Sequence, residues 1–211
     1  MHRPFTTVAA AVVLVATLAA CGPGGTPAAA PTTPHSLPGT SAAAPSPTAA
    51  STAGWTACTN ATKHFAISYP PGWHTASAGP EDACSLFDPA AFTVVDGAPV
   101  LVTQQLHAFY ASMDRLEYFA ALFPHDFFTV VSQSDVTMGG NPAIRYTVTT
   151  LPPRGPSGPT YPVGTTLYGY VVTSGARSID VGTWVAPTDA SLLPGRQAVV
   201  DLAVTTVRFS V

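Results

Sequence analysis

Residues 65–73 read FAISYPPGW and carry the clearest strand signal in this 211-residue sequence. Phe65, Ile67 and Tyr69 alternate with small residues, which is the pattern of a half-buried β-strand. The two prolines that follow cannot continue a hydrogen-bonded ladder, and Gly72 permits a tight turn. Trp73 comes directly after the turn and is expected to pack against the core. The segment therefore predicts a strand that ends in a sharp turn.

Short apolar runs separated by Gly/Pro turns continue to the end of the chain and predict an α+β domain. One helix is expected over 113–123, with Ser112 as its N-cap, Asp114 in its first turn and Pro124 at its end. A second helix is expected over 196–204. Further strands are expected over 85–87, 100–107, 127–136, 143–150, 166–173, 178–185 and 206–209. The prediction is an antiparallel sheet of about six or seven strands flanked by two helices.

The same stretch resembles a known family. Residues 65–73, with Asn60 before them and the segment Cys84-Ser85-Leu86-Phe87-Asp88-Pro89 after them, resemble the opening of PsbP-like domains and a subgroup found in actinobacterial lipoproteins. The resemblance implies an α/β/α sandwich over residues 55–211. It also implies an accessory or binding role without a shared catalytic site, so no catalytic residue is carried over from it.

The N-terminus has the features of an export signal. Arg3 precedes an apolar run from Val8 to Ala20, which would span about 20 Å as a helix at ~1.5 Å per residue and is short for a membrane crossing. Leu18-Ala19-Ala20-Cys21 followed by Gly22 resembles a bacterial lipobox. The resemblance implies a signal peptide over 1–20, cleavage before Cys21, and attachment of diacylglycerol and palmitate to that cysteine. Several acyl chains hold a protein durably on a membrane, so we expect a lipid anchor on the extracytoplasmic face.

A spacer separates the expected anchor from the expected domain. Residues 22–54 contain no charged side chain and are rich in Ala, Pro and Thr, a composition that cannot bury enough apolar surface to fold. The spacer, counted from Cys21 to residue 54, is therefore expected to be disordered. With Cys21 lipidated, the two remaining cysteines, Cys58 and Cys84, are expected to form a disulfide in an oxidising compartment.

Charge and motif content exclude several functions. The net charge is −3, and Lys63 is the chain's single lysine, so nothing predicts nucleic-acid binding. The histidines lack metal-site spacing, no phosphate-binding glycine loop is present, and no cofactor is predicted. Asn60-Ala61-Thr62 is a glycosylation sequon, read here as coincidental. His107 with an aspartate such as Asp88 or Asp180 could act as the base and orienting group of a hydrolase, and sequence alone does not place these residues together.

The preferred interpretation is a membrane-anchored, exported lipoprotein whose domain is a non-catalytic binding or accessory module of the cell envelope. Its expected partners are the membrane, through the anchor, and an envelope protein or lipid. Two alternatives stay open: a lipid or glycolipid carrier with an apolar cleft between sheet and helix, and a hydrolase with an unrecognised site. Tyr118 and Tyr161 are predicted to border the main concavity, with the loop 152–162 across its opening.

Overall fold

The computed structural model describes residues 51–94, 104–152 and 161–210, all within the compact unit Ser46–Val211. The predicted signal peptide and Cys21, most of the spacer, and most of the loop 152–162 lie outside the described residues. Within the described part, no helix is long and apolar enough to cross a membrane.

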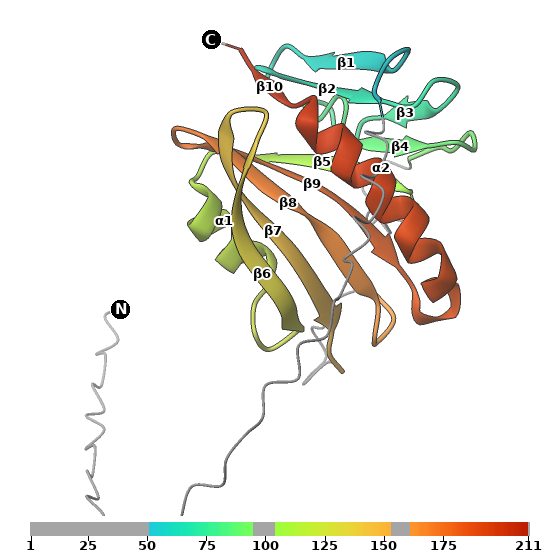
Figure 1. The fold of residues 1–211 in the computed structure, drawn as a ribbon, viewed down its shortest axis with the longest axis vertical. Helices are drawn as coiled ribbons and strands as arrows, with labels where there is room; N and C mark the ends of the chain where they lie inside the picture. Colours follow the sequence, from blue (N-terminus) through green and yellow to red (C-terminus); the bar gives the residue numbers. More distant parts are fainter. Residues whose placement is uncertain (1–50, 95–103, 153–160, 211) are drawn as a thin grey trace, which may run out of the picture. The chain divides into compact units, whose positions relative to one another are not determined.

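The described residues form ten strands, which make up two antiparallel sheets (Figure 1). The strands are β1 (Thr56–Asn60), β2 (Phe65–Tyr69), β3 (His74–Ala76), β4 (Leu86–Asp88), β5 (Leu106–Ala111), β6 (Phe128–Met138), β7 (Asn141–Thr150), β8 (Thr166–Ser174), β9 (Arg177–Val185) and β10 (Arg208–Phe209). The larger sheet has seven strands in the order β3-β4-β5-β9-β8-β7-β6, and the smaller has the order β1-β2-β10. The α+β antiparallel prediction is confirmed.

Helices cover both faces of the seven-stranded sheet. Helix α1 (Arg115–Leu122) packs on one face, where Tyr118 and Phe119 join a core with Ile144, Tyr146 and other residues of β7 and β8. Helix α2 (Leu193–Thr205) follows the 3-10 helix η1 (Pro187–Leu192) and packs on the opposite face (Figure 1). Its buried residues share a core with β8, β9 and the smaller sheet. Because side chains alternate along each strand, neighbouring residues such as Leu167 and Tyr168 serve different cores.

The structure corrects several details of the sequence prediction. Asp114, not Ser112, is the N-cap of α1: its carboxylate accepts from the amides of Leu116 (2.8 Å) and Glu117 (3.1 Å). A carboxylate caps better here because it also interacts favourably with the helix dipole. Helix α2 begins three residues earlier than expected, and residues 208–209 pair with β2 instead of extending the main sheet.

Two strands were not expected from the sequence. β1 is mostly polar and exposed, and β3 has only three residues, so neither shows a clear apolar alternation. The strand expected over 100–107 has its first part outside the described residues, and its continuation, β5, extends to Ala111. The segment 65–73 behaves as predicted: β2 stops at Tyr69, Gly72 has a φ of 79°, and Trp73 packs against the core.

Candidate functional site

The α1-facing side of the large sheet contains a row of four residues, one from each of four adjacent strands. His107, Gly182, Gly169 and Tyr146 are paired in register across β5, β9, β8 and β7. A Cβ added at Gly182 would lie 2.9 Å from the His107 ring, and one added at Gly169 would lie 2.7 Å from the Tyr146 hydroxyl. The two glycines thus leave the space into which the histidine and tyrosine side chains extend.

Asp180 lies where these two side chains meet. It precedes Gly182 by two residues on β9 and therefore faces the same side of the sheet. The His107 Nε2 lies 3.0 Å from Asp180 Oδ2, and the Tyr146 hydroxyl donates to Asp180 Oδ1 at 2.7 Å. All three side chains are buried, with at most 2 % of each residue exposed. The result is a buried polar network inside an otherwise apolar core, which we call the His107 network.

The contacts of His107 determine which ring nitrogen carries a proton. An ionised Asp180 only accepts, so Nε2 must donate to it. The Trp184 indole nitrogen also lies 3.4 Å from Nε2, but an N–H cannot bond to a nitrogen that is itself donating. The shorter, charge-assisted contact with Asp180 is the stronger one. Nδ1 of His107 is buried and has no hydrogen-bond partner among the described residues.

Three tyrosines lie within electrostatic reach of Asp180. Burial raises the pKa of Tyr146, Tyr118 and Tyr161, and in each case the negative charge of Asp180 raises the pKa further. The Tyr118 hydroxyl donates to the Phe109 carbonyl at 3.3 Å, and the Tyr161 ring centre lies 3.8 Å from that of Trp184. The pKa of each tyrosine predicted as a site residue is therefore raised in part by the same carboxylate, that of Asp180.

The His107 network contains the histidine–aspartate contact that a hydrolase would need, but no described hollow adjoins it. Asp180, not Asp88, is the partner of His107; the Asp88 carboxylate accepts from the amides of Ala90 and Gln105. One hollow of about 10 Å³ lies between Asn60, Ser85 and Tyr110, and a larger one lies at the start of α2. Neither is lined by His107, Tyr118 or Tyr161. That the two tyrosines border a concavity stays a prediction.

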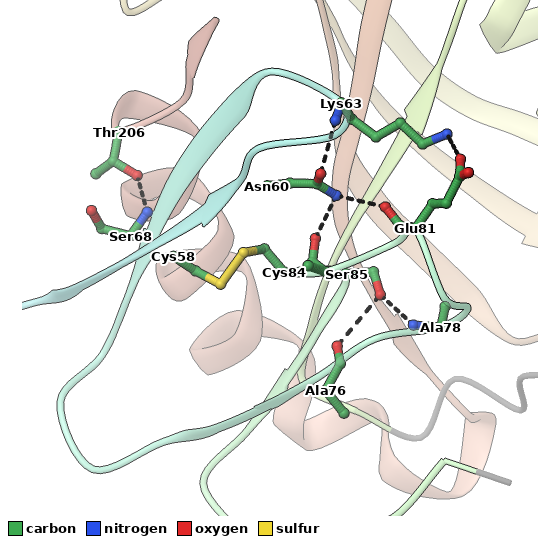
Figure 2. The surroundings of a disulfide bond; sticks show 11 residues. Cys58, Asn60, Lys63, Ser68, Ala76, Ala78, Glu81, Cys84, Ser85 and Thr206 are labelled. Carbon is green, nitrogen blue, oxygen red and sulfur yellow. Dashed lines mark hydrogen bonds and ion pairs between the residues drawn. A yellow bond between two sulfur atoms is a disulfide. The ribbon is translucent and has the colours of Figure 1, made fainter. Parts of the chain in front are cut away.

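The predicted disulfide is present and belongs to a clamp at the smaller sheet (Figure 2). Cys58 on β1 is bonded to Cys84, whose Cα lies 5.7 Å away. The Asn60 side-chain amide donates to the carbonyls of Glu81 (3.0 Å) and Ala83 (2.9 Å), and its oxygen accepts from the Lys63 amide. Asn60 is 1 % exposed, so the sequon's acceptor nitrogen is engaged in the fold. The disulfide and the hydrogen bonds of Asn60 together hold the segment before β4 in place.

Two further tyrosines have a structural role that the sequence left open. The hydroxyls of Tyr168 and Tyr170 donate to one oxygen of Asp201 on α2, at 2.5 Å and 2.8 Å, and lie 3.1 Å from each other. Both residues are buried against the core beneath α2. Their alternation was a visible signal, but their shared partner lies 31 residues beyond Tyr170 and could not be inferred from it. They attach α2 to the sheet.

Among the described residues, no group of three or more His, Cys, Asp and Glu side chains could hold a metal ion. No family model matches the chain, and no curated protein matches it. Solved structures with a similar arrangement do exist, at low identity. One is the solution structure of cyanobacterial PsbP (CyanoP) from Synechocystis, which is 9 % identical with a TM-score of 0.46, over 78 % of this chain and 98 % of that one.

Two other similar structures come from different bacteria. A protein of Bacteroides thetaiotaomicron is 12 % identical with a TM-score of 0.39, covering 70 % of this chain and 46 % of that one. Protein PA94 of Pseudomonas aeruginosa, of unknown function, is 11 % identical with a TM-score of 0.30, covering 49 % and 85 %. Similarities at this level do not transfer function. The fold class therefore rests on the strands and helices themselves.

Proposed function

We propose that this chain is an exported lipoprotein, anchored through Cys21 on the extracytoplasmic face of the membrane, whose PsbP-like domain is a non-catalytic binding or accessory module of the cell envelope. The observation that carries the proposal is the segment Leu18–Cys21 behind an apolar signal-like run. The uncharged spacer supports it, because an Ala/Pro/Thr-rich composition is typical of linkers such as those between a membrane anchor and a folded domain.

The cysteine pattern supports export independently of the N-terminal motif. Cys58 and Cys84 are bonded in the folded domain, which leaves Cys21 as the single remaining cysteine of the chain. Structural disulfides persist in oxidising compartments and are rare where thiols are kept reduced. A lone cysteine at a lipobox-like position, beside a disulfide-bonded pair, fits an exported and acylated protein.

Two observations on the described residues bear on the alternatives of a hydrolase and a lipid carrier. The His107 network is closed by its own side chains, and His107 does not line either described hollow. A lipid carrier would need an apolar cleft of at least about 300 Å³ between sheet and helix. The two described hollows are smaller, and polar side chains contribute to both.

The anchor is tested with Cys21→Ser and metabolic labelling by palmitate. We expect the wild-type protein to incorporate label and to enter the detergent phase on partitioning, and the variant to do neither. The matched control is the double variant Cys58→Ser/Cys84→Ser, which removes two cysteines and should still be labelled. A Cys21→Ser variant that partitions like the wild type would show that the anchor assignment is wrong.

The binding role is tested separately by native mass spectrometry and by crosslinking in intact cells. A binding module should crosslink reproducibly to one envelope component. Its mass in native mass spectrometry should be that of the protein without a non-covalently bound acyl ligand. Co-purification of a stoichiometric lipid would instead support the carrier alternative.

A further inference from the structure

The larger described hollow lies where η1 passes into α2. It is also lined by Gln105, the residue before β5. It measures about 240 Å³, and its walls are formed by Gln105, Ser191, Leu192, Gly195 and Arg196. The hollow is too large for a single water molecule and contains one cationic group, one amide and one hydroxyl. It is separate from the His107 network, none of whose members lines it.

Arg196 lines this hollow, and part of its hydrogen-bonding capacity is unused within the described residues. One terminal nitrogen donates to the Trp184 carbonyl at 2.7 Å. The Nε of Arg196 is buried, and none of the described residues accepts a hydrogen bond from it. No described carboxylate lies within ion-pair distance of the guanidinium either. The guanidinium therefore stands beside the hollow with a full positive charge that no described carboxylate neutralises, so an anionic ligand there would gain a charge-assisted contact.

The remaining walls indicate what kind of acceptor fits. Leu192 is 49 % exposed and offers an apolar surface beside the guanidinium. Gln105 and Ser191 add neutral polar groups that both donate and accept. A guanidinium is a good partner for a planar carboxylate, because its N–H groups match the two carboxylate oxygens. An aliphatic chain of a few carbons would then lie along Leu192.

A nearby negative charge restricts the ligand further. The Asp88 carboxylate accepts a hydrogen bond from the backbone amide of Gln105 at 3.0 Å, and it therefore lies close to a residue that lines the hollow. Asp189, in η1, is a second acidic residue two positions before Ser191. These charges repel a dianion more strongly than a monoanion. The hollow therefore favours a ligand with one carboxylate over sulfate or phosphate.

We propose that this hollow is a binding site for a small monocarboxylate with a short aliphatic chain, with Arg196 as the residue that binds the carboxylate. The inference rests on the proposed binding role and names a ligand class for it. It does not depend on the anchor at Cys21, so failure of the test below leaves the lipidation result untouched.

The test is an NMR titration of the isotope-labelled mature chain, carrying Cys21→Ser, with butyrate as the probe. We expect saturable shifts at the Gly195 and Arg196 backbone amides and at the Arg196 guanidinium N–H groups, with a dissociation constant on the order of 1 mM for a ligand of this size. Butyramide has the same shape without the charge and should bind at least about tenfold more weakly, because it loses the charge-assisted contact. Sulfate should not compete.

Two variants and their controls keep the result interpretable. Arg196→Gln should abolish the butyrate shifts, whereas Arg208→Gln, at an arginine that does not line the hollow, should leave them unchanged. Arg196 also contacts the Trp184 carbonyl, so a second variant avoids disturbing that contact: Leu192→Glu should weaken binding about tenfold by repulsion. Val163→Glu, at a residue equally exposed (50 %), should not. Equal binding of butyramide, shifts that persist in Arg196→Gln, or no saturable shift with wild type would each overturn the proposal.

Discussion

Asp180 is the residue on which the His107 network depends, because it is the acceptor for two otherwise separate side chains. Replacing Asp180 with Ala should destabilise the domain by about 3 kcal/mol, since it leaves buried donors on His107 and Tyr146 without an acceptor. The matched control is Asp135→Ala, at an exposed aspartate paired with Arg115, which should change stability by under about 0.5 kcal/mol. Urea unfolding midpoints of the two variants test this. Equal shifts would mean that the network contributes nothing beyond a surface ion pair.

Part of this residue-level arrangement was predictable and part was not. The sequence identified His107 as a candidate base and named Asp88 and Asp180 as possible partners. It could not choose between them, because the choice depends on which residue of β9 lies beside which residue of β5. Cys58 and Cys84 were easier to pair, since elimination left no other partner for either. Asn60 belongs to a sequon that was interpreted as coincidental from the sequence, and its side chain forms a structural clamp that the sequence did not indicate.

At the scale of the strands, the two paired glycines make the network possible. Gly169 on β8 and Gly182 on β9 face each other in register, directly between His107 and Tyr146. Glycine within strands generally weakens them, so its presence at neighbouring positions calls for a local reason. Here the reason is the close approach of two large polar side chains to the sheet surface. The sequence shows both glycines, but only the register shows that they are adjacent.

This arrangement predicts a strong effect for one added methyl group. In Gly169→Ala, the new Cβ would lie 2.6 Å from the Val181 carbonyl oxygen and 2.7 Å from the Tyr146 hydroxyl. Since backbone cannot move aside easily, the substitution should destabilise the domain by about 2–3 kcal/mol. Gly195→Ala is the control: nothing lies within 4 Å of a Cβ there, and alanine favours a helix, so stability should hold or rise by up to about 1 kcal/mol. Thermal unfolding of both variants would decide, and a stable Gly169→Ala protein would contradict the described packing.

The helices and strands with the clearest hydrophobic pattern were the ones that the sequence predicted correctly. The strands β8 and β9 were found from the sequence because they are buried on both faces and therefore appear as long, nearly continuous apolar runs. The helix α1 was found from its apolar residues at helical spacing. β1 and β3 were missed, since a short or mostly polar strand has no such pattern. The start of α2 was missed because a 3-10 helix runs directly into it.

At the scale of the whole domain, buried tyrosines are distributed over both cores. Tyr118 and Tyr146 belong to the core on the α1 side, Tyr161 is half-buried against Trp184, and Tyr168 and Tyr170 share Asp201 on the α2 side. Burial is the largest cause of the raised pKa in all five, with neighbouring carboxylates adding to it. Because the chain has few charged residues, several of its polar contacts in the core are made by tyrosine hydroxyls, which ionise only at alkaline pH.

These tyrosines predict a sharp loss of stability at high pH. Below about pH 10, the ordinary tyrosine value, the five phenols are neutral in both folded and unfolded chains, and their contribution to stability is complete. Above it the unfolded chain releases protons that the folded chain retains, so Tyr118 and Tyr146 each lower the free energy of unfolding by up to about 1.4 kcal/mol per pH unit, and the three less enclosed tyrosines lower it by less. We expect tyrosinate absorbance and loss of near-ultraviolet circular dichroism to appear together in one cooperative step between about pH 10 and 12. Early ionisation of most tyrosines in a protein that keeps its native circular dichroism would show that these side chains are not buried as described.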